Sequence, residues 1–306
     1  MAIALIIPDR KLDDLQQRLQ QALPDTPIEI WPQLSDPAKI TFAVLWKQPP
    51  AVVAQLPALR ALQSFGAGVD GILADSTLPR LPLARIVDPA LTAAMLQYLS
   101  GIESYYRLRL DFFRDNQQQH LWQPRSPRKL KTLCVLGLGE LGAATARYFQ
   151  QQGYTVNGWS RTPKDVPSVH CFAGTVQLAP ALAEADLVIC LLPLTPQTEN
   201  LLNANVFAMM QPGAIFINVA RGAIVDDQAL IAALDSGQLQ AACLDVFRQE
   251  PLPAEHVFWS HPAILITPHT SAVTRVDTVV AQIAENYRRS HQGLPLLNQV
   301  DLNQGY

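Results

Sequence analysis

Short runs of hydrophobic residues recur along the chain, and longer stretches with mixed polar and apolar positions separate them. The runs predict buried strands at 3–7, 42–45, 133–136, 155–159, 187–191, 215–219, 242–246 and 263–267. Such an alternation of short apolar strands with helical stretches is typical of parallel βαβ units whose sheet is covered on both faces. The pattern therefore predicts an α/β fold.

The spacing of apolar residues also indicates helices and a boundary. Residues 91–113 carry apolar side chains at helical spacing, which predicts one long helix. Gln, Pro, Ser and basic residues then replace this periodicity over 117–131. A final helix over 276–289 is expected to return to the N-terminal part of the chain. Because 306 residues exceed what one hydrophobic core usually spans, we expect two domains.

Composition limits the classes of function. Hydrophobic residues make up 49% of the chain and charged residues 16%, and the net charge is only −3, which argues against a disordered or nucleic-acid-binding protein. The apolar start lacks a basic flank and ends at Pro8, so we expect a strand and not a signal peptide. No apolar run approaches the roughly 20 residues that a membrane helix needs. We therefore expect a soluble, cytoplasmic protein that binds no membrane.

Cysteine and histidine positions give no sign of a disulfide framework or a metal site. Cys134, Cys171, Cys190 and Cys243 have no closely paired spacing, and three of them lie in apolar runs, so we expect buried free thiols. The six histidines show no ligand-like spacing.

A glycine-rich turn follows the strand at 133–136. It reads Gly137-Leu138-Gly139-Glu140-Leu141-Gly142, and a helical stretch follows it over 143–152. Between a strand and a helix, this spacing predicts a dinucleotide site. The first glycine makes the tight turn, the second lets a pyrophosphate approach the backbone, and the third lets helix and strand pack closely. Two further strand ends are expected to line the cofactor, at Leu192-Pro193 and Val219-Ala220.

The residues after the next strand bear on cofactor choice. NAD-specific proteins place an acidic residue there for the ribose hydroxyls. Here the chain reads Ser160-Arg161-Thr162-Pro163-Lys164, so Ser160, Arg161 and Lys164 could hold a 2′-phosphate. This favours NADP (NADPH). Alternatively, the two basic residues are solvated loop charges.

Three strand ends carry candidate catalytic groups. Arg221 follows the strand at 215–219, Glu250 comes shortly after the strand at 242–246, and His269 follows the strand at 263–267. Open α/β sheets bind ligands at such ends. A guanidinium binds a carboxylate with two hydrogen bonds, and a carboxylate beside a histidine favours the charged imidazolium, which can act as an acid. Each residue alone could be structural, but the set suits reduction of a 2-keto acid.

These segments resemble the D-isomer-specific 2-hydroxyacid dehydrogenase family. The resemblance rests on the glycine-rich turn, Val-Ala-Arg-Gly at 219–222, Leu-Asp-Val-Phe at 244–247, Glu-Pro-Leu-Pro at 250–253 and Thr-Pro-His at 267–269, and it covers most of the chain. Trp159-Ser160-Arg161-Thr162, Ala-Leu-Asp-Ser-Gly at 233–237 and the terminal Gly305-Tyr306 are closest to its glyoxylate/hydroxypyruvate reductase A branch. In many members a Glu lies on the long helix where this chain has Gln97-Tyr98.

The resemblance implies an activity and an architecture. The activity is NADPH-dependent reduction of glyoxylate to glycolate and of hydroxypyruvate to D-glycerate, with Arg221, Glu250 and His269 as the catalytic triad and Asp245 near the nicotinamide. The architecture is two Rossmann-like domains with parallel sheets and the active site in the cleft between them. The substrate domain would combine 1–97 with 279–306, the NADP-binding domain would span 98–278, and the enzyme would be a homodimer.

The resemblance also implies a substrate loop at 65–70. Its Gly66, Ala67 and Gly68 would let backbone amides converge on a carboxylate, and Trp46 could line the same pocket.

Three alternatives remain open. Formate dehydrogenases of this fold resemble a pattern with Gln in place of the carboxylate paired to His, so Glu250 argues against that activity. The chain could be a dinucleotide-sensing scaffold, similar to the C-terminal-binding-protein corepressors, although it has no evident peptide-binding extension. It could also reduce a bulkier 2-keto acid.

Overall fold

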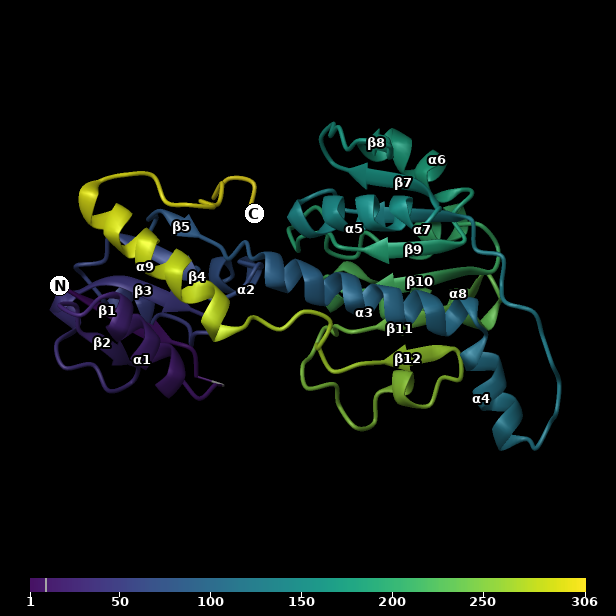
Figure 1. The fold of residues 1–306 in the computed structure, drawn as a ribbon, viewed down its shortest axis with the longest axis horizontal. Coiled ribbons are helices and arrows are strands. Elements are labelled where there is room, and N and C mark those ends of the chain that lie inside the picture. The colour runs from purple at the N-terminus through teal and green to yellow at the C-terminus, as the bar shows by residue number, and fades with distance from the viewer. Residues whose placement is uncertain (9) are drawn as a thin grey trace. The chain divides into compact units, whose positions relative to one another are not determined.

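The computed structural model describes residues 1–8 and 10–306, and these form two compact units (Figure 1). One unit combines residues 1–91 with 274–306, and the other spans residues 92–273. The sequence predicted boundaries after residue 97 and before residue 279.

The first unit is built on a five-stranded parallel sheet with the order β2-β1-β3-β4-β5. The strands are β1 (Ala2–Ile6), β2 (Ile28–Ile30), β3 (Ile40–Leu45), β4 (Ala61–Ser64) and β5 (Leu83–Ala84). Its helices are α1 (Asp13–Ala22), α2 (Asp70–Leu73) and α9 (Val276–Gln292).

Helices α1 and α9 lie side by side in this unit although they come from opposite ends of the chain. On α9, Val279, Ile283 and Tyr287 are buried in one apolar cluster with residues of β1 and β3. The Tyr287 ring contacts the edge of Phe42, with ring centroids 5.9 Å apart. The prediction that the final helix returns to the N-terminal part of the chain is thus confirmed.

The second unit contains a seven-stranded parallel sheet with the order β12-β11-β10-β9-β6-β7-β8. Its strands are β6 (Thr132–Leu136), β7 (Thr155–Ser160), β8 (His170–Ala173), β9 (Leu187–Cys190), β10 (Ala214–Asn218), β11 (Leu239–Leu244) and β12 (Ile264–Ile266). Its helices are α3 (Pro89–Arg107), which begins just before the boundary, α4 (Leu110–Gln118), α5 (Glu140–Gln151), α6 (Leu178–Leu182), α7 (Ala204–Met209) and α8 (Asp227–Asp235).

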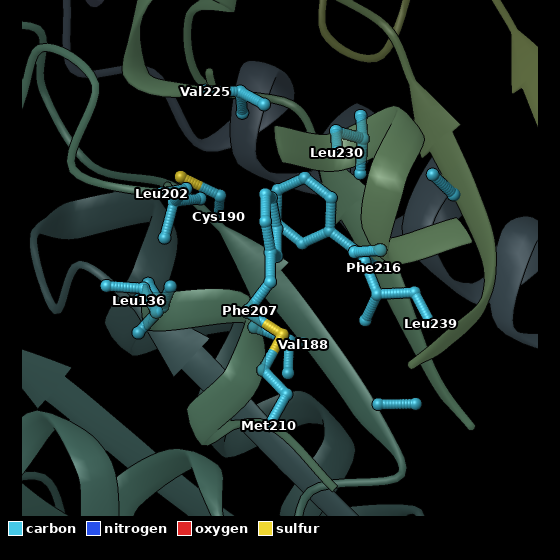
Figure 2. Close-up of a cluster of buried hydrophobic side chains, with 14 of the residues drawn as sticks. Leu136, Val188, Cys190, Leu202, Phe207, Met210, Phe216, Val225, Leu230 and Leu239 are labelled. Atoms are coloured by element: carbon cyan, nitrogen blue, oxygen red, sulfur yellow. The ribbon is translucent and has the colours of Figure 1, made fainter. Parts of the chain in front are cut away.

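Both faces of this sheet are covered, which explains why its central strands are continuously apolar. Leu133 and Val135 of β6 pack with residues of α3 and α5, whereas Cys134 and Leu136 pack with residues of α6, α7 and α8. In the latter cluster the Phe207 ring lies beside the Phe216 ring (Figure 2), and the two phenyl rings meet edge to face with centroids 5.7 Å apart. The predicted α/β class with parallel sheets is therefore correct.

The single helix predicted over 91–113 is wrong, because the chain breaks between α3 and α4 at Arg109, whose φ is 60°. Residue 128 returns to this break: the Arg128 backbone N–H donates to Arg107 O, and its side chain donates to Tyr106 O. The same guanidinium makes two bonds to Asp111 at 2.7–2.8 Å. A tertiary contact thus terminates α3, and apolar periodicity alone does not reveal it.

All eight predicted strands are present, with ends shifted by at most three residues, but β2, β4, β5 and β8 were missed. The four cysteines are free; Cys134, Cys190 and Cys243 are buried, and Cys171 on the edge strand β8 is only half-buried. Within the described part of the chain, no helix is long and apolar enough to cross a membrane.

Candidate active site

The candidate residues of the second unit start from one row of backbone positions. The paired residues across the sheet are Trp159, Leu136, Cys190, Asn218, Leu244 and Ile266. All these strands are parallel, so this row lies at the carboxyl edge, where open α/β sheets bind ligands. The glycine-rich turn and the segments that carry Arg221, Glu250 and His269 all leave the sheet from this edge.

The glycine-rich turn has a backbone that other residues would not fit. Gly137 has a φ of 102°, and a Cβ there would lie 2.7 Å from Leu191 O. A Cβ on Gly142 would lie 1.6 Å from Gly137 O, so this glycine lets α5 approach the strand. Gly139 is the N-cap of α5, and a Cβ there would meet nothing within 4 Å. The open approach to the first amides of a helix suits a pyrophosphate.

The neighbouring residues differ in exposure. Glu140 is exposed and Leu141 half-buried in the first turn of α5, whereas Leu192 is buried beside half-buried Pro193. Val219 and Ala220 are buried after β10.

The segment after β7 presents two basic residues. Ser160 is buried, and its hydroxyl donates to Thr162 O at 2.8 Å, which closes the turn. Arg161 and Lys164 are exposed. No described residue between 160 and 164 is acidic, so no carboxylate of this turn opposes a phosphate.

Glu250 and His269 form a direct pair. His269 Nδ1 is 2.8 Å from Glu250 Oε2, and the side chains are 34% and 23% exposed. Because an ionised carboxylate only accepts, Nδ1 carries a proton, and Nε2 is left to act on a ligand. Glu250 Oε1 also accepts from the Phe247 N–H at 3.2 Å. The structure thus brings together two of the three predicted catalytic residues.

Asp245 is completely buried and organises the turn that carries His269. Its carboxylate accepts from Thr270 N at 2.8 Å, from Ser271 N at 2.9 Å and from Thr267 Oγ1 at 2.6 Å. Its backbone carbonyl accepts from the His269 N–H at 2.8 Å. Sequence analysis did not identify this function of Asp245, and it overlooked Thr267 although Thr267 begins the Thr-Pro-His motif.

Arg221 lies in a turn that Asn218 closes at the end of β10. Asn218 is buried, accepts from Ala220 N at 3.1 Å and donates to Arg221 O at 3.0 Å. The half-buried Arg221 side chain donates from Nη1 to Ala220 O at 2.6 Å. Asn218 was another residue that sequence analysis missed.

Two further contacts join the turn of Arg221 to the loop of Glu250. A Cβ on Gly222 would lie 2.0 Å from Phe247 C, so the two backbones are in contact. The Arg248 guanidinium donates to Val225 O at 2.5 Å and also bonds the Asn200 side chain. The two loops therefore form one packed layer.

In the first unit, the predicted substrate loop follows β4. The Ser64 hydroxyl donates to Gly68 O at 2.8 Å and accepts from Gly66 N at 3.1 Å, so it holds a tight loop with Ala67 at its tip. A Cβ on Gly66 would lie 2.4 Å from Trp46 Cζ3. The Trp46 ring thus lies against the loop, as the prediction of a shared pocket requires. Sequence analysis did not single out Ser64.

Comparisons with known proteins show the family to which the chain belongs. The model of the family "D-isomer specific 2-hydroxyacid dehydrogenase, NAD binding domain" matches residues 104–271. The chain is 38% identical over 296 residues to glyoxylate/hydroxypyruvate reductase A of Yersinia enterocolitica, and the match covers 94% of each chain.

Solved structures are similar over the full length. One similar structure is a D-isomer specific 2-hydroxyacid dehydrogenase from Xanthobacter autotrophicus in complex with NADPH and MES. It is 38% identical in sequence with a TM-score of 0.95, and the match covers 100% of this chain and 99% of that one. An NADPH-dependent glyoxylate/hydroxypyruvate reductase from Sinorhizobium meliloti, in complex with NADP and sulfate, is 31% identical, has a TM-score of 0.93, and the match covers all of both chains.

Proposed function

Because the chain belongs to the D-isomer-specific 2-hydroxyacid dehydrogenase family and is an oxidoreductase, we propose that it reduces small 2-keto acids, glyoxylate and hydroxypyruvate among them, with NADPH. The observation that carries the proposal is the Glu250–His269 pair, which leaves the carboxyl edge of the sheet beside the turn of Arg221.

The catalytic roles follow from the chemistry of these side chains. NADPH, when bound, supplies the hydride for the keto carbon. Arg221 binds the substrate carboxylate through its planar fork and polarises the carbonyl. His269 donates a proton from Nε2 to the oxygen that becomes the hydroxyl, while Glu250 holds Nδ1–H and stabilises the imidazolium. Each turnover consumes one proton and leaves a 2-hydroxy acid.

The residues of the second unit fit a dinucleotide. The proposed site comprises the glycine-rich turn with Glu140 and Leu141, the strand ends at Leu192, Pro193, Val219 and Ala220, and Asp245. The preference for NADP is supported by Ser160, Arg161 and Lys164, since residues 160–164 include basic and no acidic side chains where NAD-specific proteins place a carboxylate for the ribose hydroxyls. The complexes of related proteins with NADPH and NADP support the same choice.

The substrate side of the proposal rests on the first unit. The Gly66–Gly68 loop, which Ser64 holds through Gly66 N and Gly68 O, would present the backbone amides of Ala67 and Gly68 to the keto acid, and Trp46 would limit the length of its side chain. We further propose that residues 1–97 with 279–306 form a substrate domain and that residues 98–278 form an NADP domain. The proposed enzyme is a homodimer located in the cytoplasm.

The direct test is NADPH oxidation, followed at 340 nm, with a panel of 2-keto acids of increasing side-chain length. We expect glyoxylate and hydroxypyruvate to give the highest kcat/KM. A maximum at a larger keto acid would instead assign a bulkier substrate. Tight NADPH binding without turnover of any keto acid would contradict the proposed reaction and favour a dinucleotide-sensing scaffold.

An Arg221→Lys variant tests the mechanism within the same assay. Lysine keeps the charge but loses the planar fork, so kcat/KM should fall at least tenfold while NADPH affinity stays near the wild-type value, since about 1.4 kcal/mol of transition-state binding corresponds to tenfold in rate. Unchanged turnover would remove Arg221 from the mechanism.

A further inference from the structure

Tyr98 of α3 reaches the candidate site through a short row of polar atoms. Its hydroxyl oxygen is 2.7 Å from Thr267 Oγ1 and 3.4 Å from Cys243 Sγ. Thr267 Oγ1 is in turn 2.6 Å from Asp245 Oδ1. The row lies within the largely apolar layer between α3 and the sheet.

The donors in this row can be assigned from the carboxylate outward. The Asp245 carboxylate accepts from two backbone N–H groups and has no proton of its own to donate. Thr267 therefore gives its only hydroxyl proton to Asp245. Thr267 Oγ1 can then only accept from Tyr98, which must be the donor. Burial raises the pKa of Tyr98 above its usual range and that of Cys243 to about 12, so both keep their protons at neutral pH. The Cys243 thiol is left to donate to Tyr98.

At its other end, the row meets a strained turn. His269 has a φ of 54°, a left-handed conformation that residues other than glycine adopt only when their surroundings hold it. The residues that follow it, Thr270 and Ser271, are both held by the Asp245 carboxylate. If this carboxylate were free to change its orientation, its hydrogen bonds to Thr270 and Ser271 would weaken, and the backbone at His269 would be held less firmly.

We propose that Tyr98 is a positioning residue for His269. Its hydroxyl fixes the rotamer of Thr267, Thr267 fixes one oxygen of Asp245, and Asp245 holds the turn that aims the imidazole. The consequence for catalysis rests on the proposed function, in which His269 is the acid. The effect on the turn itself does not depend on that function.

A matched pair of variants on α3 tests the proposal. Tyr98→Phe removes the hydroxyl that donates to Thr267. Tyr106→Phe, two turns along the same helix, removes a buried hydroxyl that donates to Ala242 O at 3.1 Å, outside the row. From the loss of one buried hydrogen bond, we expect kcat for glyoxylate to fall about fivefold in Tyr98→Phe, with KM and NADPH affinity within about twofold of wild type. Tyr106→Phe should keep kcat. Equal kcat losses in both variants would overturn the proposal, because they would indicate general destabilisation.

Double variants test whether the row acts in series. Thr267→Val removes the intermediate hydroxyl, so adding Tyr98→Phe to it should lower kcat no further. Thr267→Ser keeps the hydroxyl and should keep most of the activity. Losses that multiply in the double variant would show that Tyr98 acts independently of Thr267, against the proposal.

Hydrogen exchange in the protein without cofactor or substrate provides a readout that requires no turnover. The amides of Thr270 and Ser271 donate to Asp245, so they should exchange faster in Tyr98→Phe than in Tyr106→Phe. If the wild-type enzyme reduced no 2-keto acid but this difference appeared, the proposed function would fail and the positioning would stand. Identical exchange in the two variants would overturn the positioning whatever the activity.

Discussion

Replacing Glu250 with glutamine should slow the reduction. His269 must carry the proton that it gives to the product oxygen when the hydride arrives. Glu250 stabilises the charged ring, because its Oε2 is 2.8 Å from Nδ1. Glutamine has almost the same size but no charge, so kcat/KM should fall.

The size of the loss follows from the geometry of the pair. Hydrogen bonds between charged groups are roughly twice as strong as neutral ones, so the lost charge corresponds to about 1.5 kcal/mol. About 1.4 kcal/mol corresponds to tenfold in rate, so kcat/KM should fall about tenfold. Because the side chains are 34% and 23% exposed, solvent screening keeps the loss from being much larger.

The amide adds a geometric conflict. Glu250 Oε1 accepts from Phe247 N, and Oε2 faces His269 Nδ1. Glutamine has one oxygen, so it can accept from only one of these two donors and turns its NH₂ group toward the other. If NH₂ faces His269, it favours the imidazole without a proton on Nδ1, which also lowers kcat/KM.

The assay is kcat/KM for glyoxylate with saturating NADPH at one fixed pH. Glu255→Gln is the matched control, since it removes the same charge from an exposed position on the same loop. We expect the control to keep the wild-type kcat/KM and Glu250→Gln to bind NADPH normally. An unchanged kcat/KM in Glu250→Gln would refute the argument that Glu250 supports the acid.

Three further predictions concern the cofactor site and the core. Arg161→Ala should weaken NADPH binding by about 1–3 kcal/mol and NADH binding far less, measured by fluorescence titration, whereas equal losses would exclude a 2′-phosphate contact. Arg147→Ala, at an exposed position on α5, controls for general charge. Gly142→Ala places a Cβ 1.6 Å from a backbone carbonyl oxygen and should lower the free energy of unfolding, measured by chemical denaturation, by about 3 kcal/mol or more. A Cβ at Gly101 on α3 would meet nothing within 4 Å, so Gly101→Ala should instead raise that free energy by about 0.5–1 kcal/mol. Burial raises the pKa of Cys190 to about 12, so the thiol loses its proton at lower pH in the unfolded chain than in the folded one. The free energy of unfolding should therefore fall between about pH 9 and 12. Cys190→Ala should reduce the slope of that fall by about 1.4 kcal/mol per pH unit, and an unchanged slope would contradict the burial argument.

Apolar patterning predicted much of the second unit because its central strands are buried on both faces. Runs such as 187–191 and 215–219 stand out from any amphipathic helix, and the end of the second run locates Arg221 at the edge of the sheet. Strand β5 has two residues, and β8 is an edge strand with half-buried positions, so neither has a strong apolar signal. The break at Arg109 depends on Arg128, which is distant in sequence.

The sequence predicted those candidate site residues whose chemistry can be recognised from their immediate neighbours in the chain. A charged residue just after an apolar strand is visible in the sequence, which is why Arg221, Glu250 and His269 were singled out. Residues that act through them were not. Tyr98 and Thr267 are 169 residues apart, and nothing in their local sequence distinguishes their hydroxyls from those of other buried polar residues.

The three proposed catalytic residues all belong to the unit that spans 92–273, and their supports lie there too. Backbone contact between Gly222 and Phe247 joins the turn of Arg221 to the loop of Glu250, and the 2.8 Å pair joins that loop to His269. Displacing any one of these segments would therefore disturb the other two. Packed backbones and buried hydrogen bonds within this unit hold the proposed acid and the proposed carboxylate-binding group. If the Gly66–Gly68 loop selects the substrate, as proposed, changes in that loop should alter the choice of 2-keto acid more than the rate with the smallest substrate.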